Sequence, residues 1–172
     1  MAYKVEQDWE YKGLRCVVVM TDIGHRCGYV GVDKDHPLYK VDYQSHCAFL
    51  KSRWEEAKTG AIGGRGIIPL VCWDGETVSP EIVFDVHGGI TYSRGAIDYP
   101  VDSDLWWFGY DCAHAGDAKD LNAIEDKEIR NKQSIKQIYE RYHIAGDVVR
   151  SLGYCIEQCE KLADQLNEVK EV

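Results

Sequence analysis

The sequence has no long apolar run and few basic residues. Spanning a bilayer takes about 20 consecutive apolar residues, and no stretch comes near that length. The first residues, MAYKVEQDWEYKG, also lack the apolar core of a signal peptide. Lys and Arg number 20 against 29 Asp and Glu, so the net charge is −9. A protein that neutralises many nucleic-acid phosphates needs the opposite balance. We therefore expect a cytoplasmic protein that binds neither membranes nor nucleic acid.

Several signatures of chemistry are missing as well. The seven cysteines form no CxxC pair, and Cys155 and Cys159 lie four apart, which is not a spacing of zinc ligands. In a reducing compartment we expect free thiols that pack as small hydrophobic side chains. The glycine-rich stretch TGAIGGRGIIP (59–69) is not followed by the Gly-Lys-Ser/Thr of a phosphate-binding loop, and no HExxH motif is present.

The patterns that are present predict an α+β fold. A chain of 172 residues suits one domain with a substantial core. CVVVM (16–20) and RCGYVGV (26–32) predict a β-hairpin around Gly24 and His25. Further strands are predicted for IIPLVCW (67–73), EIVFDVHGGITYS (81–93) and DLWWFGYD (104–111), and a short helix for QSHCAFLKSRWEEAK (44–58). We expect a mainly antiparallel sheet with this short helix and a long C-terminal amphipathic helix, in a single domain over 1–172 with a charged insertion at about 118–146.

The C-terminal segment carries a regular apolar stripe. Its positions step by three and four residues: Leu152, Cys155, Cys159, Leu162, Leu166 and Val169. This spacing is typical of a helix with one apolar face. We expect that face to pack on the core of its own chain, although the heptad spacing would also suit a partner helix in a homo-oligomer.

Polar, titratable residues gather at three strand ends. They are Asp22 and His25 at the hairpin, Asp85 and His87 in the stretch 81–93, and Asp111, His114 and Asp117 after DLWWFGYD. Side chains alternate between the faces of a strand, so Asp85 and His87 are predicted to share a face. If the three strands are neighbours, these groups converge on one site.

Converging His and Asp residues would serve two kinds of site. They are good ligands for a divalent metal, and such a centre activates water for hydrolysis. They also hydrogen-bond a base or a ribose. Cys112, two residues before His114, is interpreted as a small buried hydrophobic residue and not as a nucleophile.

Other residues favour a pocket for a small nucleotide-like ligand. Aromatic side chains can form a stacking wall, from Tyr29, Tyr92, Trp106, Trp107 and Tyr110. Gly88, Gly89 and Gly116 can expose backbone N–H groups. Arginine prefers planar, bidentate contacts with phosphates, and Arg26, Arg65 and Arg94 are the candidates.

The order of several motifs resembles a group of small uncharacterised proteins of phages and prophages. The motifs are GHRCGYVGV (24–32), HPLY (36–39), DY (42–43), VHGGITYS (86–93), WWFGYDCAHAGD (106–117) and YCIEQCEKLADQL (154–166). The resemblance covers about residues 14–117 and the last helix. It implies a protein of the host-cell cytoplasm, and small phage proteins of this size often counter host defences.

Our leading hypothesis is a phage accessory protein that binds, and sequesters without turnover, a small nucleotide-derived defence signal. It requires no cofactor and no metal. The predicted ligand-binding residues are His25, Arg26, Arg65, Asp85, His87, Tyr92, Arg94, Asp111, His114 and Asp117. Two alternatives stay open: a metal-assisted hydrolase that uses the same His and Asp residues, and a protein inhibitor whose acidic surface engages a host defence protein.

Overall fold

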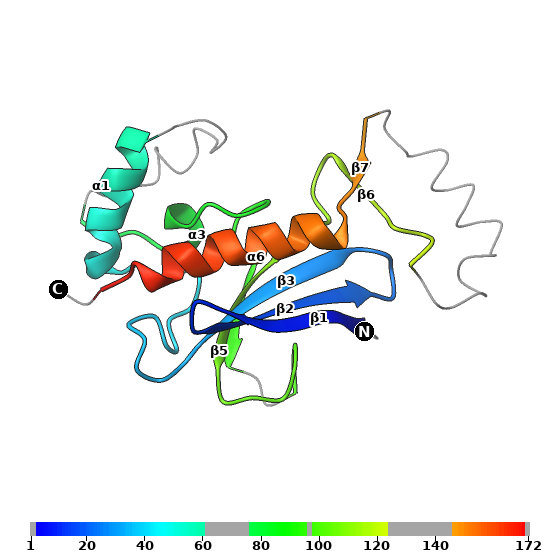
Figure 1. The fold of residues 1–172 in the computed structure, drawn as a ribbon. Helices are drawn as coiled ribbons and strands as arrows, with labels where there is room; N and C mark the ends of the chain where they lie inside the picture. The colour runs from blue at the N-terminus through cyan, green and yellow to red at the C-terminus, as the bar shows by residue number, and fades with distance from the viewer. Residues whose placement is uncertain (1–2, 61–75, 96–97, 124–145, 171–172) are drawn as a thin grey trace.

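The computed structural model describes residues 3–60, 76–95, 98–123 and 146–170. It confirms the predicted α+β class: a five-stranded antiparallel sheet carries a long C-terminal helix across one face (Figure 1). Within these ranges, no helix is both long and apolar enough to cross a membrane.

The strand order in the sheet is β1-β2-β3-β5-β4, and every neighbouring pair is antiparallel. The strands are β1 (Tyr3–Tyr11), β2 (Leu14–Thr21), β3 (Arg26–Val32), β4 (Tyr92–Gly95) and β5 (Trp106–Asp111). The predicted hairpin is β2–β3. Strand β1 was not predicted. It joins β2 through Lys12 and Gly13, both with positive φ (48° and 83°), as tight hairpin turns require.

Both faces of the central strands are covered, which explains the unbroken apolar run in β2. Cys16 and Val18 face the C-terminal helix, whereas Val17 and Val19 pack on the other face against Tyr29 and Trp107. The loop 98–105 contributes Tyr99, Val101 and Leu105 to that second cluster. A strand in which apolar and polar residues alternate buries only one face. The continuous apolar run is therefore typical of a strand that is buried on both faces.

Two glycine–tyrosine pairs meet in the middle of the sheet. Gly28 on β3 lies directly opposite Tyr110 on β5, and Tyr29 lies opposite Gly109. A Cβ at residue 28 would come within 2.5 Å of the Tyr110 ring, and one at residue 109 within 2.5 Å of the Tyr29 ring. Each tyrosine ring therefore occupies the space that the opposite glycine leaves, one ring on each face of the sheet.

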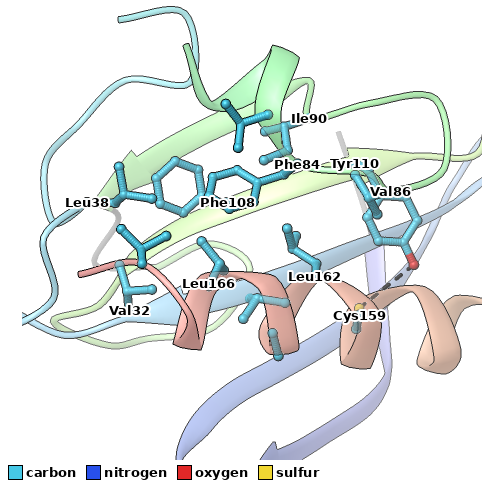
Figure 2. Close-up of a cluster of buried hydrophobic side chains, with 14 of the residues drawn as sticks. Val32, Leu38, Phe84, Val86, Ile90, Phe108, Tyr110, Cys159, Leu162 and Leu166 are labelled. Atoms are coloured by element: carbon cyan, nitrogen blue, oxygen red, sulfur yellow. Dashed lines mark hydrogen bonds between the residues drawn. The ribbon is translucent and has the colours of Figure 1, made fainter. Parts of the chain in front are cut away.

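Helix α6 (Leu152–Asn167) uses the predicted apolar stripe inside its own chain. Cys155, Cys159, Leu162 and Leu166 are fully buried against β2, β3 and β5. Figure 2 shows Leu162 and Leu166 facing Phe84 and Phe108, with the Tyr110 hydroxyl directed at Cys159. The expected docking on the core is thus observed. A homo-oligomer through α6 stays a prediction, and it would have to use the other sides of this helix.

The predicted strand at 81–93 is wrong over most of its length. Residues Pro80–Val83 form a short helix, α3, and only β4 from Tyr92 onward joins the sheet. Proline is favoured in a first helical turn, and Gly88 and Gly89 adopt positive φ (66° and 84°), which breaks an extended strand.

The predicted short helix is shifted toward the C-terminus. A 3₁₀ turn, η1 (Ala48–Leu50), leads into α1 (Lys51–Gly60), and Leu50 and Trp54 are buried as the stripe predicts. The predicted strand at 67–73 lies outside the described residues, as does most of the charged segment 118–146. On either side of that segment, two short strands pair in parallel: β6 (Asp117–Ala118) and β7 (Val148–Val149).

Candidate functional site

Three of the predicted residues meet where the chain leaves β5. One donor atom from each of His87, His114 and Asp117 lies within 4.8 Å of the other two. His87 belongs to the loop between α3 and β4, His114 to the turn after β5, and Asp117 to β6. In Figure 1 this region lies beside the N-terminal end of α6, where β6 and β7 run together.

Asp117 is the centre of the cluster, and its side chain is fully inaccessible to solvent. Its Oδ1 accepts a bond from Arg150 Nε at 2.7 Å. Its Oδ2 accepts one from the backbone N–H of His114 at 3.0 Å and lies 2.7 Å from His87 Nε2. Burial raises the pKa of this carboxyl, but the bonds from Arg150, His87 and His114 outweigh burial, so the pKa lies below its ordinary value.

His87 is held through both ring nitrogens and its backbone N–H. Its Nδ1 lies 3.0 Å from the Tyr154 hydroxyl, and its backbone N–H donates to Gln158 Oε1 at 2.9 Å. Because a carboxylate only accepts, Nε2 donates to Asp117 and Nδ1 accepts from Tyr154. The ring is therefore fixed between a carboxylate and a phenol, with only 11% of the side chain exposed.

His114 is the open member of the cluster, with 35% of its side chain exposed. Its Nδ1 lies 3.1 Å from the backbone carbonyl of Asp111 and 3.6 Å from that residue's Oδ1. A carbonyl only accepts, so Nδ1 carries the proton and Nε2 keeps its lone pair in the neutral ring. Gly88 makes room for this ring, because a Cβ at residue 88 would lie 2.2 Å from it.

Asp111 supports the cluster without belonging to it. Its Oδ2 accepts from the Thr91 hydroxyl at 2.8 Å and its Oδ1 from the Ala113 N–H at 3.0 Å. These bonds close the turn that follows β5. His25 also touches this turn, since its Nδ1 donates to the carbonyl of Cys112 at 2.7 Å.

Two other predicted site residues, Arg26 and Asp85, pair with residues outside the cluster. The buried guanidinium of Arg26 pairs with Glu6 (2.6 Å) and Asp120 (3.0 Å) and donates to the carbonyl of Arg150. Exposed Asp85 pairs with Lys161 at 2.6 Å. The prediction that Asp85 and His87 share one face of a strand is thus wrong, because residues 84–91 do not form a strand.

The remaining predicted contacts do not join the cluster. Tyr92 lies on the opposite face of the sheet, where its ring packs edge-on against those of Tyr29 and Tyr99. Arg94 is exposed on β4, opposite Trp107. Arg65 lies outside the described residues.

Sequence reasoning missed two residues of the site, Arg150 and Tyr154. They stack on each other, with the Arg150 Cζ 5.1 Å from the centre of the Tyr154 ring. The spacing of the sequence does contain a signal for Tyr154. A second, polar stripe runs beside the apolar one, with its residues four, three and four positions apart: Tyr154, Gln158, Lys161 and Gln165. Every member of that stripe bonds to Asp85 or His87.

The cluster presents two imidazoles and one carboxylate, the donor set of many transition-metal centres. Two of the donor residues are oriented through their other polar atom: His87 by Tyr154 and Asp117 by Arg150. The His114 ring is held by the Asp111 carbonyl through Nδ1, which also lies 4.0 Å from Asp117 Oδ2. Partners of this kind are usual behind metal ligands, because they fix the tautomer and the ring orientation.

Comparisons with protein-family models, with curated proteins and with solved structures return no match.

Proposed function

We propose that this protein is a metal-assisted hydrolase whose centre consists of His87, His114 and Asp117. The observation that carries the proposal is the arrangement of the three donors: they lie within 4.8 Å of one another, and each is held by a separate partner. The His114 side chain is 35% exposed, and its Nε2 has no hydrogen-bond partner among the described residues. A polar cluster that only stabilised the fold would not need such a histidine.

The donor set favours Zn²⁺ or another first-row transition metal over Mg²⁺ or Ca²⁺, which prefer oxygen ligands. A metal held by His87, His114 and Asp117 would supply an activated water for hydrolysis. The His114 side chain is 35% exposed, so the cluster is open to solvent on that side.

The hydrogen bonds explain how the ligands become available. For His87 to hold a metal through Nε2, the ring proton that now lies between Nε2 and Asp117 Oδ2 would have to move to Nδ1, which is the other neutral tautomer. The Tyr154 hydroxyl would then accept from Nδ1 instead of donating to it, because a hydroxyl both donates and accepts. Arg150 keeps Asp117 in place through the second carboxylate oxygen and adds a cation beside the site.

The first experiment measures zinc binding by titration calorimetry on chelator-stripped protein. The wild type is expected to bind one equivalent. His114→Ala removes one ligand and Tyr154→Phe removes the partner of His87, and each is expected to weaken binding at least about tenfold. His46→Ala is the matched control, since His46 is exposed and bonds only to the Thr77 hydroxyl among the described contacts.

The proposal is wrong if stripped wild-type protein takes up no stoichiometric zinc, or if His114→Ala binds as tightly as His46→Ala. Hydrolysis is then tested with a panel of phosphodiesters and cyclic nucleotides. Turnover should stop with chelator, return with the divalent ion, and be lost in His114→Ala.

The sequestration of a nucleotide-derived ligand is a second candidate, supported by one observation. Arg150 and Tyr154 place a cation over an aromatic ring beside two imidazoles, and these groups suit a phosphate and a base. Heat release after incubation with the same panel separates the two candidates, because a sequestering protein returns the intact ligand and a hydrolase returns product.

A further inference from the structure

Two buried thiols face each other behind the metal cluster. The Sγ atoms of Cys112 and Cys155 lie 3.7 Å apart, and the two residues are 2% and 0% exposed. Cys112 follows β5, and Cys155 lies in the first turn of α6. Both are free cysteines.

The backbone around both thiols is held in place. The Cys112 N–H donates to the carbonyl of Arg26 at 2.9 Å, and the Cys155 N–H donates to the carbonyl of Ser151 at 3.1 Å. The buried Tyr110 hydroxyl donates to the carbonyl of Cys155 at 2.8 Å. Two anchored segments thus keep the sulfur atoms close, and a disulfide, with its S–S bond of about 2.05 Å, needs an approach of under roughly 2 Å.

We propose that Cys112 and Cys155 are an oxidation site, at which a peroxide converts the two thiols into a disulfide between the exit of β5 and α6. The proposal does not depend on the metal centre. It assigns a modification to residues that sequence patterns predict only as small hydrophobic side chains.

The chemistry balances with one peroxide. One sulfur, as a thiolate, attacks the O–O bond, which gives a sulfenic acid and releases one water after proton transfer. The second thiol attacks that sulfur, the S–S bond forms and the second water leaves. Two thiols lose two electrons and two protons, and hydrogen peroxide is reduced to two molecules of water.

The two thiols are hydrogen-bonded to each other, with 3.7 Å between the sulfur atoms. Either sulfur can therefore attack the peroxide, and the other is placed to resolve the sulfenic acid.

The disulfide would also shift residues of the neighbouring cluster of His87, His114 and Asp117. Cys112 lies two residues before His114, and Cys155 directly follows Tyr154. Drawing the sulfur atoms together moves the turn after β5 toward the start of α6, which are the two segments that carry His114 and Tyr154.

The experiment treats the full-length folded protein with hydrogen peroxide and removes the peroxide. It then unfolds the protein in urea, blocks the remaining thiols with N-ethylmaleimide and maps the peptides by mass spectrometry. The expected product is a cross-linked peptide pair that contains Cys112 and Cys155 and lacks two hydrogens. Five of the seven thiols should stay alkylatable, and dithiothreitol should restore all seven.

Variants make the assignment specific. Cys112→Ser and Cys155→Ser should each abolish the cross-link, whereas Cys47→Ser, which changes a more accessible cysteine, should retain it. The wild-type map does not depend on whether a variant folds. The proposal is overturned if Cys112 and Cys155 stay alkylatable after Cys47 has been oxidised, or if either one cross-links to a different cysteine.

Discussion

At the scale of single residues, two contacts between a glycine and a tyrosine determine how β3 and β5 pair at the centre of the sheet. Tyr110 lies over Gly28, and Tyr29 lies over Gly109 across the same pair of strands. A slip of β5 by one residue would place each ring against a side chain and turn it to the wrong face. The two Gly-Tyr dipeptides therefore fix the register of β3 and β5, and with it the point at which Cys112 and His114 leave the sheet.

Gly28→Ala should destabilise the protein by about 1–3 kcal/mol, because a methyl group within 2.5 Å of the buried Tyr110 ring forces a shift in a packed core. Gly153→Ala is the matched control. It makes the same chemical change in the first turn of α6, where the nearest atom is 3.9 Å from the new Cβ, and should stabilise the helix by about 0.5–1 kcal/mol. Urea unfolding measures both, and equal effects would contradict the steric argument.

At the scale of elements, α6 carries two stripes with different partners. The apolar stripe packs on the sheet, and the polar stripe accepts the backbone N–H groups of Asp85 and His87, which lie outside any strand. Gln165 is the clearest case. Its Oε1 accepts from the Asp85 N–H at 2.8 Å and its Nε2 donates to the Asp85 carbonyl at 2.9 Å, which is the bonding that a neighbouring strand would supply.

This difference explains what could be predicted from the sequence. The hairpin, β5 and α6 follow from local patterns, as do the positions of His114 and Asp117 just after a core strand. The loop 84–91 has the alternation of a strand, but the backbone N–H groups of Asp85 and His87 bond to side chains 80 and 71 residues away. No local pattern encodes such distant partners. His87 does lie beside His114 and Asp117, but not through the strand face that the alternation predicts.

Gln165→Glu should destabilise the protein by about 1–2 kcal/mol, because the carboxylate can still accept from the Asp85 N–H but cannot donate to the Asp85 carbonyl. Gln158→Glu is the control. Gln158 only accepts, from the N–H of His87, and a carboxylate can do the same, so the expected change is under about 0.5 kcal/mol. Thermal unfolding of both variants compares them, and similar losses would show that the donor of Gln165 contributes nothing.

At the scale of the whole molecule, two buried ionic networks join segments that are far apart in the sequence. Asp117 links the loop of His87, the turn of His114 and Arg150 before α6. Arg26 links β1 through Glu6 to Asp120, and it donates to the carbonyl of Arg150. Arg150 belongs to both networks, so the proposed metal centre rests on the same contacts that hold β6 against the start of α6.

From the Asp117 network we predict how the free energy of unfolding changes at acid pH in metal-free buffer. The folded-state pKa of Asp117 lies below the unfolded value of about 3.9. Its contribution is therefore fully present above pH 5 and is lost as the pH falls through the folded-state pKa. Asp117→Asn should cost about 1–3 kcal/mol at pH 7, since Arg150 loses a charged partner in a buried site. That difference from the wild type should shrink between pH 5 and pH 3.

Urea unfolding at several pH values measures this convergence. Asp85→Asn is the control, because Asp85 pairs with Lys161 at the surface, where such pairs contribute about 0–1 kcal/mol. It should track the wild type at every pH. If the gap between Asp117→Asn and the wild type stayed constant down to pH 3, the charge of Asp117 would not be what stabilises the network. The carboxylate would then stabilise the fold by its shape and neutral hydrogen bonds, and not as the charged partner of Arg150.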